Sequence, residues 1–162
     1  MSPNLFACNE WEDLVGQLIE SRALVDLNQG VDLRVLTDHK VEMLRKIRLK
    51  AIHVAWDRIE DEKHIVPKME MLKEVTGWGR WKCNVYVLIN FDTTLEEDLH
   101  RIMECRRIGF DPYVMVYQKD KLPKQCVQNR LQRWVNFRPL WGKYSTFKEF
   151  WGANYKTPYM EV

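Results

Sequence analysis

The stretch VYVLINFDTTLEEDLHRIMECRRIGFDPYVMVY, residues 85–117, decides the fold class of this 162-residue chain. Its first part, Val85–Phe91, is apolar and has the length of a strand. Thr94 and Glu97 then have the spacing of a capping box, and Gly109 stands where a helix commonly ends. A second apolar run, Tyr113–Tyr117, follows that glycine. The stretch therefore predicts a strand, a helix and a second strand.

The same unit is found on both sides of this stretch. Leu24–Leu27 and Ala51–Trp56 are further apolar runs, and each precedes a segment with helical spacing of apolar residues. A polar turn is expected at 28–30. Before the first run, Asn9 and Glu12 have the spacing of a helix start, so the chain is expected to open with a helix. Alternating strands and helices indicate an α/β fold with a parallel sheet.

The two faces of the predicted strands differ. In Val85–Phe91 one face is apolar, whereas the other carries Tyr86, Asn90 and the following Asp92. A sheet covered by helices on both sides would be apolar on both faces, so this pattern favours part of a barrel. We expect a partial (β/α) barrel with about four parallel strands and helices on the outer face. Residues 1–162 form one domain in this interpretation, with an irregular aromatic tail at 139–162.

Composition narrows the class of protein without naming a ligand. With 46% hydrophobic residues the chain is globular, and its formal charge of +2 does not by itself indicate a nucleic-acid or membrane partner. The four cysteines include no closely spaced pair, so no local zinc or iron–sulfur motif is present. We expect reduced thiols in a cytoplasmic protein, with no metal site, signal peptide or membrane span.

Polar residues follow each predicted strand, and parallel strands bring such residues to one edge of the sheet. They are the candidate site residues. In strand order they are Asn28 and Gln29, then Asp57 and Arg58, then Asn90, Asp92 and Thr93, then Tyr117 and Lys119.

Several segments, in order along the chain, resemble the C-terminal half of radical S-adenosylmethionine (SAM) enzymes, in a bacterial and phage group of that family. The segments are Ser2–Cys8 (SPNLFAC) with Trp11, Val25–Thr37 (VDLNQGVDLRVLT), Ile52–Arg58 (IHVAWDR), Tyr86–Leu99 (YVLINFDTTLEEDL), Gly109–Tyr117 (GFDPYVMVY) and Leu131–Asn136 (LQRWVN).

The resemblance implies a SAM cleft without its redox half. Enzymes of this family hold a [4Fe–4S] cluster on a C-x₃-C-x₂-C motif, which this sequence lacks. The resemblance therefore implies that the first strand and its cluster loop are not part of the chain, and that the chain alone is inactive in radical chemistry. A second copy or another chain is expected to complete the barrel. Neither the substrate nor a catalytic residue is indicated.

Within the resemblance, the ten cofactor-binding candidates are Gln29, Gly30, Asp32, Arg34, Asp57, Arg58, Asn90, Asp92, Thr93 and Tyr117. Arg34 would pair with the SAM carboxylate, and Asp57 or Asp92 would accept hydrogen bonds from ribose hydroxyls. The family's loop after the corresponding strand is usually rich in glycine, and residues 90–94 contain none.

Each candidate also has a structural interpretation. Asp92 and Thr93 have the position of helix caps, Gln29 and Gly30 that of a turn, and Asp57 and Arg58 that of a surface ion pair. His53 is typical of a hydrogen-bonded interior histidine.

Three other functions remain open. In the first, the chain is a binding or interaction module that catalyses no reaction. In the second, it is an enzyme that uses SAM without a cluster, for example in methyl transfer. In the third, it binds nucleic acid through basic and aromatic residues near its C-terminus. These are Arg130, Arg133, Trp134, Arg138, Trp141, Lys143, Tyr144 and Trp151.

Overall fold

The four apolar runs form one parallel sheet in the computed structural model, which describes residues 4–152. The strands are β1 (Val25–Val31), β2 (Leu49–Ala55), β3 (Cys83–Ile89) and β4 (Asp111–Val116), in the spatial order β1-β2-β3-β4. Every neighbouring pair is parallel, and each strand lies beside the next one along the chain. The sheet is open, as in part of a (β/α) barrel, which confirms the predicted fold class.

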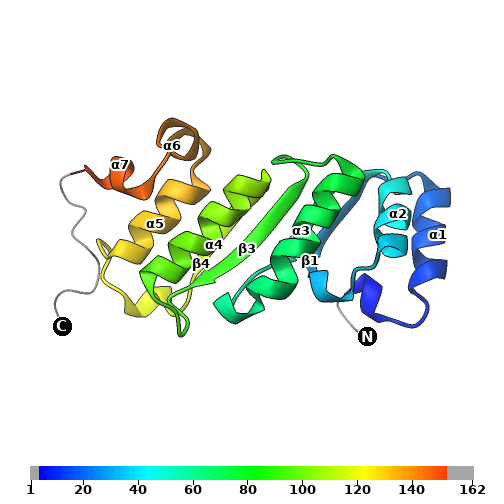
Figure 1. Ribbon diagram of the computed structural model, residues 1–162, viewed down its shortest axis with the longest axis horizontal. Helices are drawn as coiled ribbons and strands as arrows, with labels where there is room; N and C mark the ends of the chain where they lie inside the picture. Colours follow the sequence, from blue (N-terminus) through cyan, green and yellow to red (C-terminus); the bar gives the residue numbers. More distant parts are fainter. Residues whose placement is uncertain (1–3, 153–162) are drawn as a thin grey trace.

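Helices connect the strands. They are α1 (Trp11–Ser21), α2 (Asp38–Lys46), α3 (Glu62–Thr76), α4 (Leu95–Ile108), α5 (Val127–Asn136), α6 (Arg138–Lys143) and α7 (Phe147–Trp151). Short 3₁₀ turns lie at Leu5–Ala7, Leu33–Val35, Ile59–Asp61 and Lys119–Lys121. Figure 1 shows α1 to α5 side by side in one layer, with α1 at the end of the row beside α2. In the described part of the chain, no helix combines the length and hydropathy needed to cross a bilayer.

This single layer gives the sheet two different faces. Val85, Val87 and Ile89 of β3 are completely buried under the helices. On the opposite face, Tyr113 and Met115 of β4 remain exposed. Rings form a row across that face: His53 stacks on Tyr86 with ring centroids 5.0 Å apart, and Tyr86 meets Tyr113 edge-on at 5.8 Å. The face that would line a barrel is therefore partly apolar and carries aromatic rings.

Local signals fix most helix ends. Thr94 and Glu97 form the predicted capping box of α4, and Gly109 ends that helix in the left-handed conformation, at φ 89°. The Thr37 side chain accepts a hydrogen bond from the amide of Lys40 at the start of α2. These contacts explain why the strand and helix units were recognisable in the sequence.

Three local expectations were wrong. The turn expected at 28–30 is part of β1, because Gly30 takes a φ of 83° in an irregular stretch of the ladder between Leu27 and Val31. Asn9 does not begin α1, whose first residue follows Glu10. The tail expected to be irregular contains α6 and α7, which pack their aromatic residues into the core. Residues 153–162 of that tail lie outside the described residues.

The two outer strands have different surroundings. Val114 in β4 is buried, and both of its backbone groups are bonded by α5: its N–H donates to Asn136 Oδ1 at 2.8 Å, and its carbonyl accepts from Gln132 and Asn136 at 2.9 Å. In contrast, a hollow of about 120 Å³ follows β1 and is lined by Leu5 and residues 26–31. Amide side chains of α5 therefore occupy the edge of the sheet at β4.

Candidate functional site

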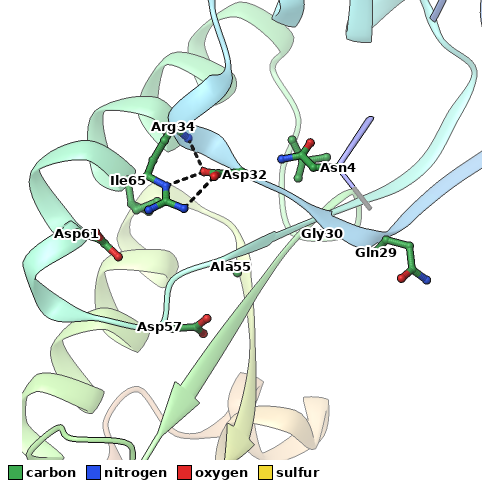
Figure 2. A pocket seen from close by; sticks show the side chains of 10 residues that line it. Asn4, Gln29, Gly30, Asp32, Arg34, Ala55, Asp57, Asp61 and Ile65 are labelled. Atoms are coloured by element: carbon green, nitrogen blue, oxygen red, sulfur yellow. Dashed lines mark hydrogen bonds and ion pairs between the residues drawn. The ribbon is translucent and has the colours of Figure 1, made fainter. Parts of the chain in front are cut away.

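A cavity of about 230 Å³ lies over the carboxyl ends of β1 and β2. Five of the candidates predicted from the sequence line it: Gln29, Gly30, Asp32, Arg34 and Asp57. Asn4, Val31, Ala55, Asp61 and Ile65 complete the lining. Figure 2 shows Asp32 and Asp57 on opposite sides of the space between the end of β1 and the loop that follows β2, and the Gln29 side chain points away from these two carboxylates. Two predicted strand ends therefore meet in one cavity.

Asp32 and Arg34 form an ion pair at the wall of this cavity (Figure 2). Arg34 Nε donates to Asp32 Oδ1 at 2.9 Å and Arg34 Nη2 donates to Asp32 Oδ2 at 2.8 Å. Asp32 Oδ1 also accepts the Arg34 amide. These donors hold the pKa of the Asp32 carboxyl below its ordinary value. The guanidinium expected to meet a ligand carboxylate thus already has a carboxylate partner.

The remaining polar groups of the cavity come from other elements. Asp57 is exposed in the loop after β2, and Asp61 ends the 3₁₀ turn before α3. The Gln29 amide nitrogen donates to Asn28 Oδ1 at 3.3 Å, which places those two candidates together on β1. Carboxylate oxygens and a side-chain amide can accept hydrogen bonds from hydroxyls and amines. The cavity is therefore suited to a small polar ligand that is rich in donors.

The ends of β3 and β4 have a different environment. Asn90 Nδ2 donates to the carbonyl of Tyr117 at 3.2 Å, and Gln128 of α5 donates to Asn90 Oδ1 at 3.3 Å. The Tyr117 ring packs edge-on against Phe91, with centroids 4.7 Å apart. These two candidates meet each other, but they are not part of the cavity over β1 and β2. Their hydrogen bonds join β3, β4 and α5.

Thr93 is hydrogen-bonded to a buried ion pair, Asp98 with Arg101, below this edge. The Thr93 hydroxyl donates to Asp98 Oδ1 at 2.7 Å, and Asp98 Oδ2 accepts a hydrogen bond from the backbone N–H of Asn90 at 3.3 Å. Arg101, which is completely buried, donates to Asp98 at 2.6 Å and to the carbonyls of Trp56 and Leu88 at 2.7 and 2.9 Å. Burial raises the pKa of the Asp98 carboxyl, and these donors oppose that rise. The ion pair ties the ends of β2 and β3 to α4.

The loop after β3 has no glycine, yet its backbone takes conformations that usually favour one. Asn90 has a φ of 63° and Asp92 a φ of 54°. Asn and Asp tolerate this left-handed region better than other residues with a side chain. The loop is thus built with short polar residues where the resembled family usually has glycine. Asp92 is exposed, and Thr94 rather than Asp92 or Thr93 caps the helix.

The remaining candidates lie outside the cavity. Arg58 is exposed and its carbonyl accepts the indole N–H of Trp56 at 2.8 Å. Lys119 donates to Gln132 at 2.5 Å beside α5. The sequence placed all these residues at one edge of the sheet, but the structure separates the two pairs of strand ends.

Sequence reasoning missed Asp98 and Arg101. Their i, i+3 spacing lies on the buried side of α4 together with Leu95, Ile102 and Cys105. A charged pair of opposite sign on the apolar stripe was the available signal, because such residues are rarely buried unless they are paired.

The cysteines do not fit an iron–sulfur cluster. Burial raises the pKa of the Cys83 and Cys105 thiols to about 12, which disfavours the thiolate form that ligates iron. Cys8 Sγ lies 3.1 Å from the carbonyl of Leu5. Within residues 4–152, no three His, Cys, Asp or Glu side chains are arranged to hold a metal ion. No step of a reaction can be assigned to a cluster on these residues.

Comparison of the chain with protein-family models, curated proteins and solved structures finds no match.

Proposed function

We propose that this chain is one part of a (β/α) barrel and that its rim over β1 and β2 binds a SAM-type ligand. The observation that carries the proposal is the cavity lined by Gln29, Gly30, Asp32, Arg34 and Asp57, residues that the sequence resemblance had singled out for this ligand. Asp57 suits ribose hydroxyls, and Arg34 suits a carboxylate that competes with Asp32 for it. The chain's own role is binding and orientation.

The proposal includes a partner beside β1. At about 230 Å³ the cavity is smaller than the 300–1,000 Å³ typical of pockets that enclose a whole ligand. It lies at the β1 side of the sheet, and β1 is an edge strand that pairs only with β2 among the described strands. A second copy or another chain added there would close the cavity around the rest of the ligand. The free thiols of the described residues suit a reducing compartment, and we place the protein in the cytoplasm.

Calorimetric titration with S-adenosylhomocysteine tests the ligand, because this analogue needs no cluster. We expect saturable binding that adenosine alone does not reproduce, since adenosine lacks the carboxylate. Sedimentation equilibrium in the same buffer tests the partner, with a dimer as the expected result for a second copy. The absence of heat or saturation at millimolar analogue would contradict the ligand.

A module that binds a partner without using SAM is the second candidate. The exposed aromatic face of the sheet favours it, because Tyr113 and Met115 are left uncovered. Self-association or partner binding without any response to the analogue would favour this function over the first.

A further inference from the structure

A hollow beside β4 combines aromatic, cationic and amide side chains. Its lining consists of Tyr113, Lys119, Asn129, Gln132, Arg133, Asn136 and Phe137. Four of these residues follow the i, i+3, i+4, i+7 spacing of a single face of α5. The hollow is thus a groove between that helix face and the last strand of the sheet, away from the cavity over β1 and β2.

Two of the rings in this groove are available for stacking. Tyr113 is 49% exposed and Phe137 is 54% exposed. Tyr113 also meets Tyr86 edge-on, so the ring row of the uncovered sheet face leads into the groove. Directly after Phe137, Arg138 lies over the ring of Trp81, 4.2 Å from its centroid, and Trp81 is 74% exposed. Aromatic rings therefore continue beyond the groove, at Tyr86 next to Tyr113 and at Trp81 next to Arg138.

The segment that forms most of the groove is mainly basic, although one of its arginines, Arg138, lies 3.8 Å from the carboxylate of Asp111. Residues 117–138 contain six basic side chains and a single acidic one, Asp120, although the whole chain has a net charge of only +2. Arg133 lines the groove, and Arg130 lies one helical turn before it. The lining contains no carboxylate. A polyanion is the class of ligand that complements this segment.

We propose that this groove binds single-stranded nucleic acid, with bases stacked on Tyr113 and Phe137 and phosphates near Arg133 and Lys119. Stacking on exposed rings needs bases that are not already stacked in a duplex, which favours a single strand. Asn129 and Gln132 line the groove beside the rings, and their amide nitrogens donate hydrogen bonds to the backbone carbonyls of Pro123 and Val114. The tryptophans first considered for this role, Trp134 and Trp141, are buried in the core. The inference goes beyond the SAM-type site and does not depend on it.

Fluorescence anisotropy with a labelled oligouridylate of about twelve nucleotides tests the proposal. We expect a Kd of roughly micromolar order at 50 mM salt that weakens as salt rises to 200 mM. Arg133→Ala is expected to weaken binding and to lower the log–log salt slope by about 0.7. Tyr113→Ala and Phe137→Ala are each expected to weaken binding about tenfold while the salt slope stays unchanged.

Matched controls lie on the β1 side of the molecule. Lys46→Ala removes an exposed charge from α2, and Leu24→Ala removes an exposed apolar side chain. Both should bind like the unaltered protein, and circular dichroism should show that all variants are folded. No binding at 50 mM salt would overturn the proposal. Equal affinity for a duplex of the same length or for heparin, or full affinity of folded Tyr113→Ala and Phe137→Ala, would also overturn it.

Discussion

The two halves of the sheet's carboxyl edge use similar residues for different purposes. At β3 and β4, Asn90 and Thr93 form hydrogen bonds with α4, with α5 and with the residue that follows β4. At β1 and β2, Gln29 and Asp57 line an open cavity. Polar residues at strand ends are therefore not equivalent, because some bond distant elements of the fold and others line an open cavity.

The largest expected effect is on the β3 and β4 half. Arg101→Met should lower the free energy of unfolding by about 3–5 kcal/mol, because it leaves Asp98 buried without its charge partner. Urea denaturation measures the loss. Arg107→Met, which removes an arginine from exposed ion pairs on the same helix, is the control and should leave the midpoint nearly unchanged. Equal effects of the two substitutions would contradict the role given to the buried pair.

Removing the side-chain cover of β4 should have the next largest effect. Asn136→Leu leaves the buried N–H of Val114 without an acceptor, which should cost about 1–3 kcal/mol. It should also promote association at high protein concentration, because an uncovered strand edge can pair with another chain. Thermal unfolding and sedimentation velocity measure both results. Gln125→Leu removes an exposed amide just before the start of α5, and a similar loss there would count against the specific contact.

Thr93→Val tests whether that residue is structural. The substitution removes the hydroxyl that donates to buried Asp98, and we expect a loss of about 1–2 kcal/mol in unfolding free energy. Binding of S-adenosylhomocysteine should not change. Weaker binding by a protein of normal stability would instead assign Thr93 to the ligand site.

Asp57→Asn, at the β1 and β2 half of the edge, should weaken ligand binding and leave stability unchanged. Asp57 is exposed, so the unfolding midpoint should stay the same. Affinity for S-adenosylhomocysteine should fall about tenfold, because a hydrogen bond to a charged acceptor is replaced by a weaker neutral one. Asp13→Asn on α1 removes the same charge away from the cavity and serves as the control in the same titration. Unchanged affinity of Asp57→Asn would remove Asp57 from the site.

The smallest effect is expected in the loop after β3. Asp92→Gly should raise the unfolding free energy by at most about 1 kcal/mol, because glycine takes a φ of 54° without the strain of a side chain. Thermal unfolding detects the change as a higher midpoint. A clear fall in stability would mean that the Asp92 side chain makes a stabilising contact.

Residues close in sequence were sufficient to predict much of the fold. Alternation in Val85–Phe91, the capping box at Thr94 and the glycine at 109 act within a few residues, so strand, helix and order could be inferred without tertiary information. Gly30 was misjudged because a glycine at positive φ suits both a turn and an irregular strand, and only pairing with β2 decides between them.

The candidate site was predictable only in part. The parallel topology correctly placed the strand ends on one edge, but the cavity forms over β1 and β2 alone. Asn90 lies outside this cavity, and its side-chain oxygen accepts a hydrogen bond from Gln128, which lies 38 residues further along the chain. The buried pair of Asp98 and Arg101 depends on carbonyls of β2 and β3, contacts that no local pattern encodes.

The central claim is that the ends of β1 and β2 bind the ligand, whereas the ends of β3 and β4 stabilise the fold. Amide chemical-shift mapping during a titration with S-adenosylhomocysteine tests this claim most directly. The account predicts the largest shifts at Gln29, Gly30 and Asp57, with little change at Asn90 and Thr93. Shifts concentrated at Asn90 and Thr93 instead, or none at saturating analogue, would contradict it.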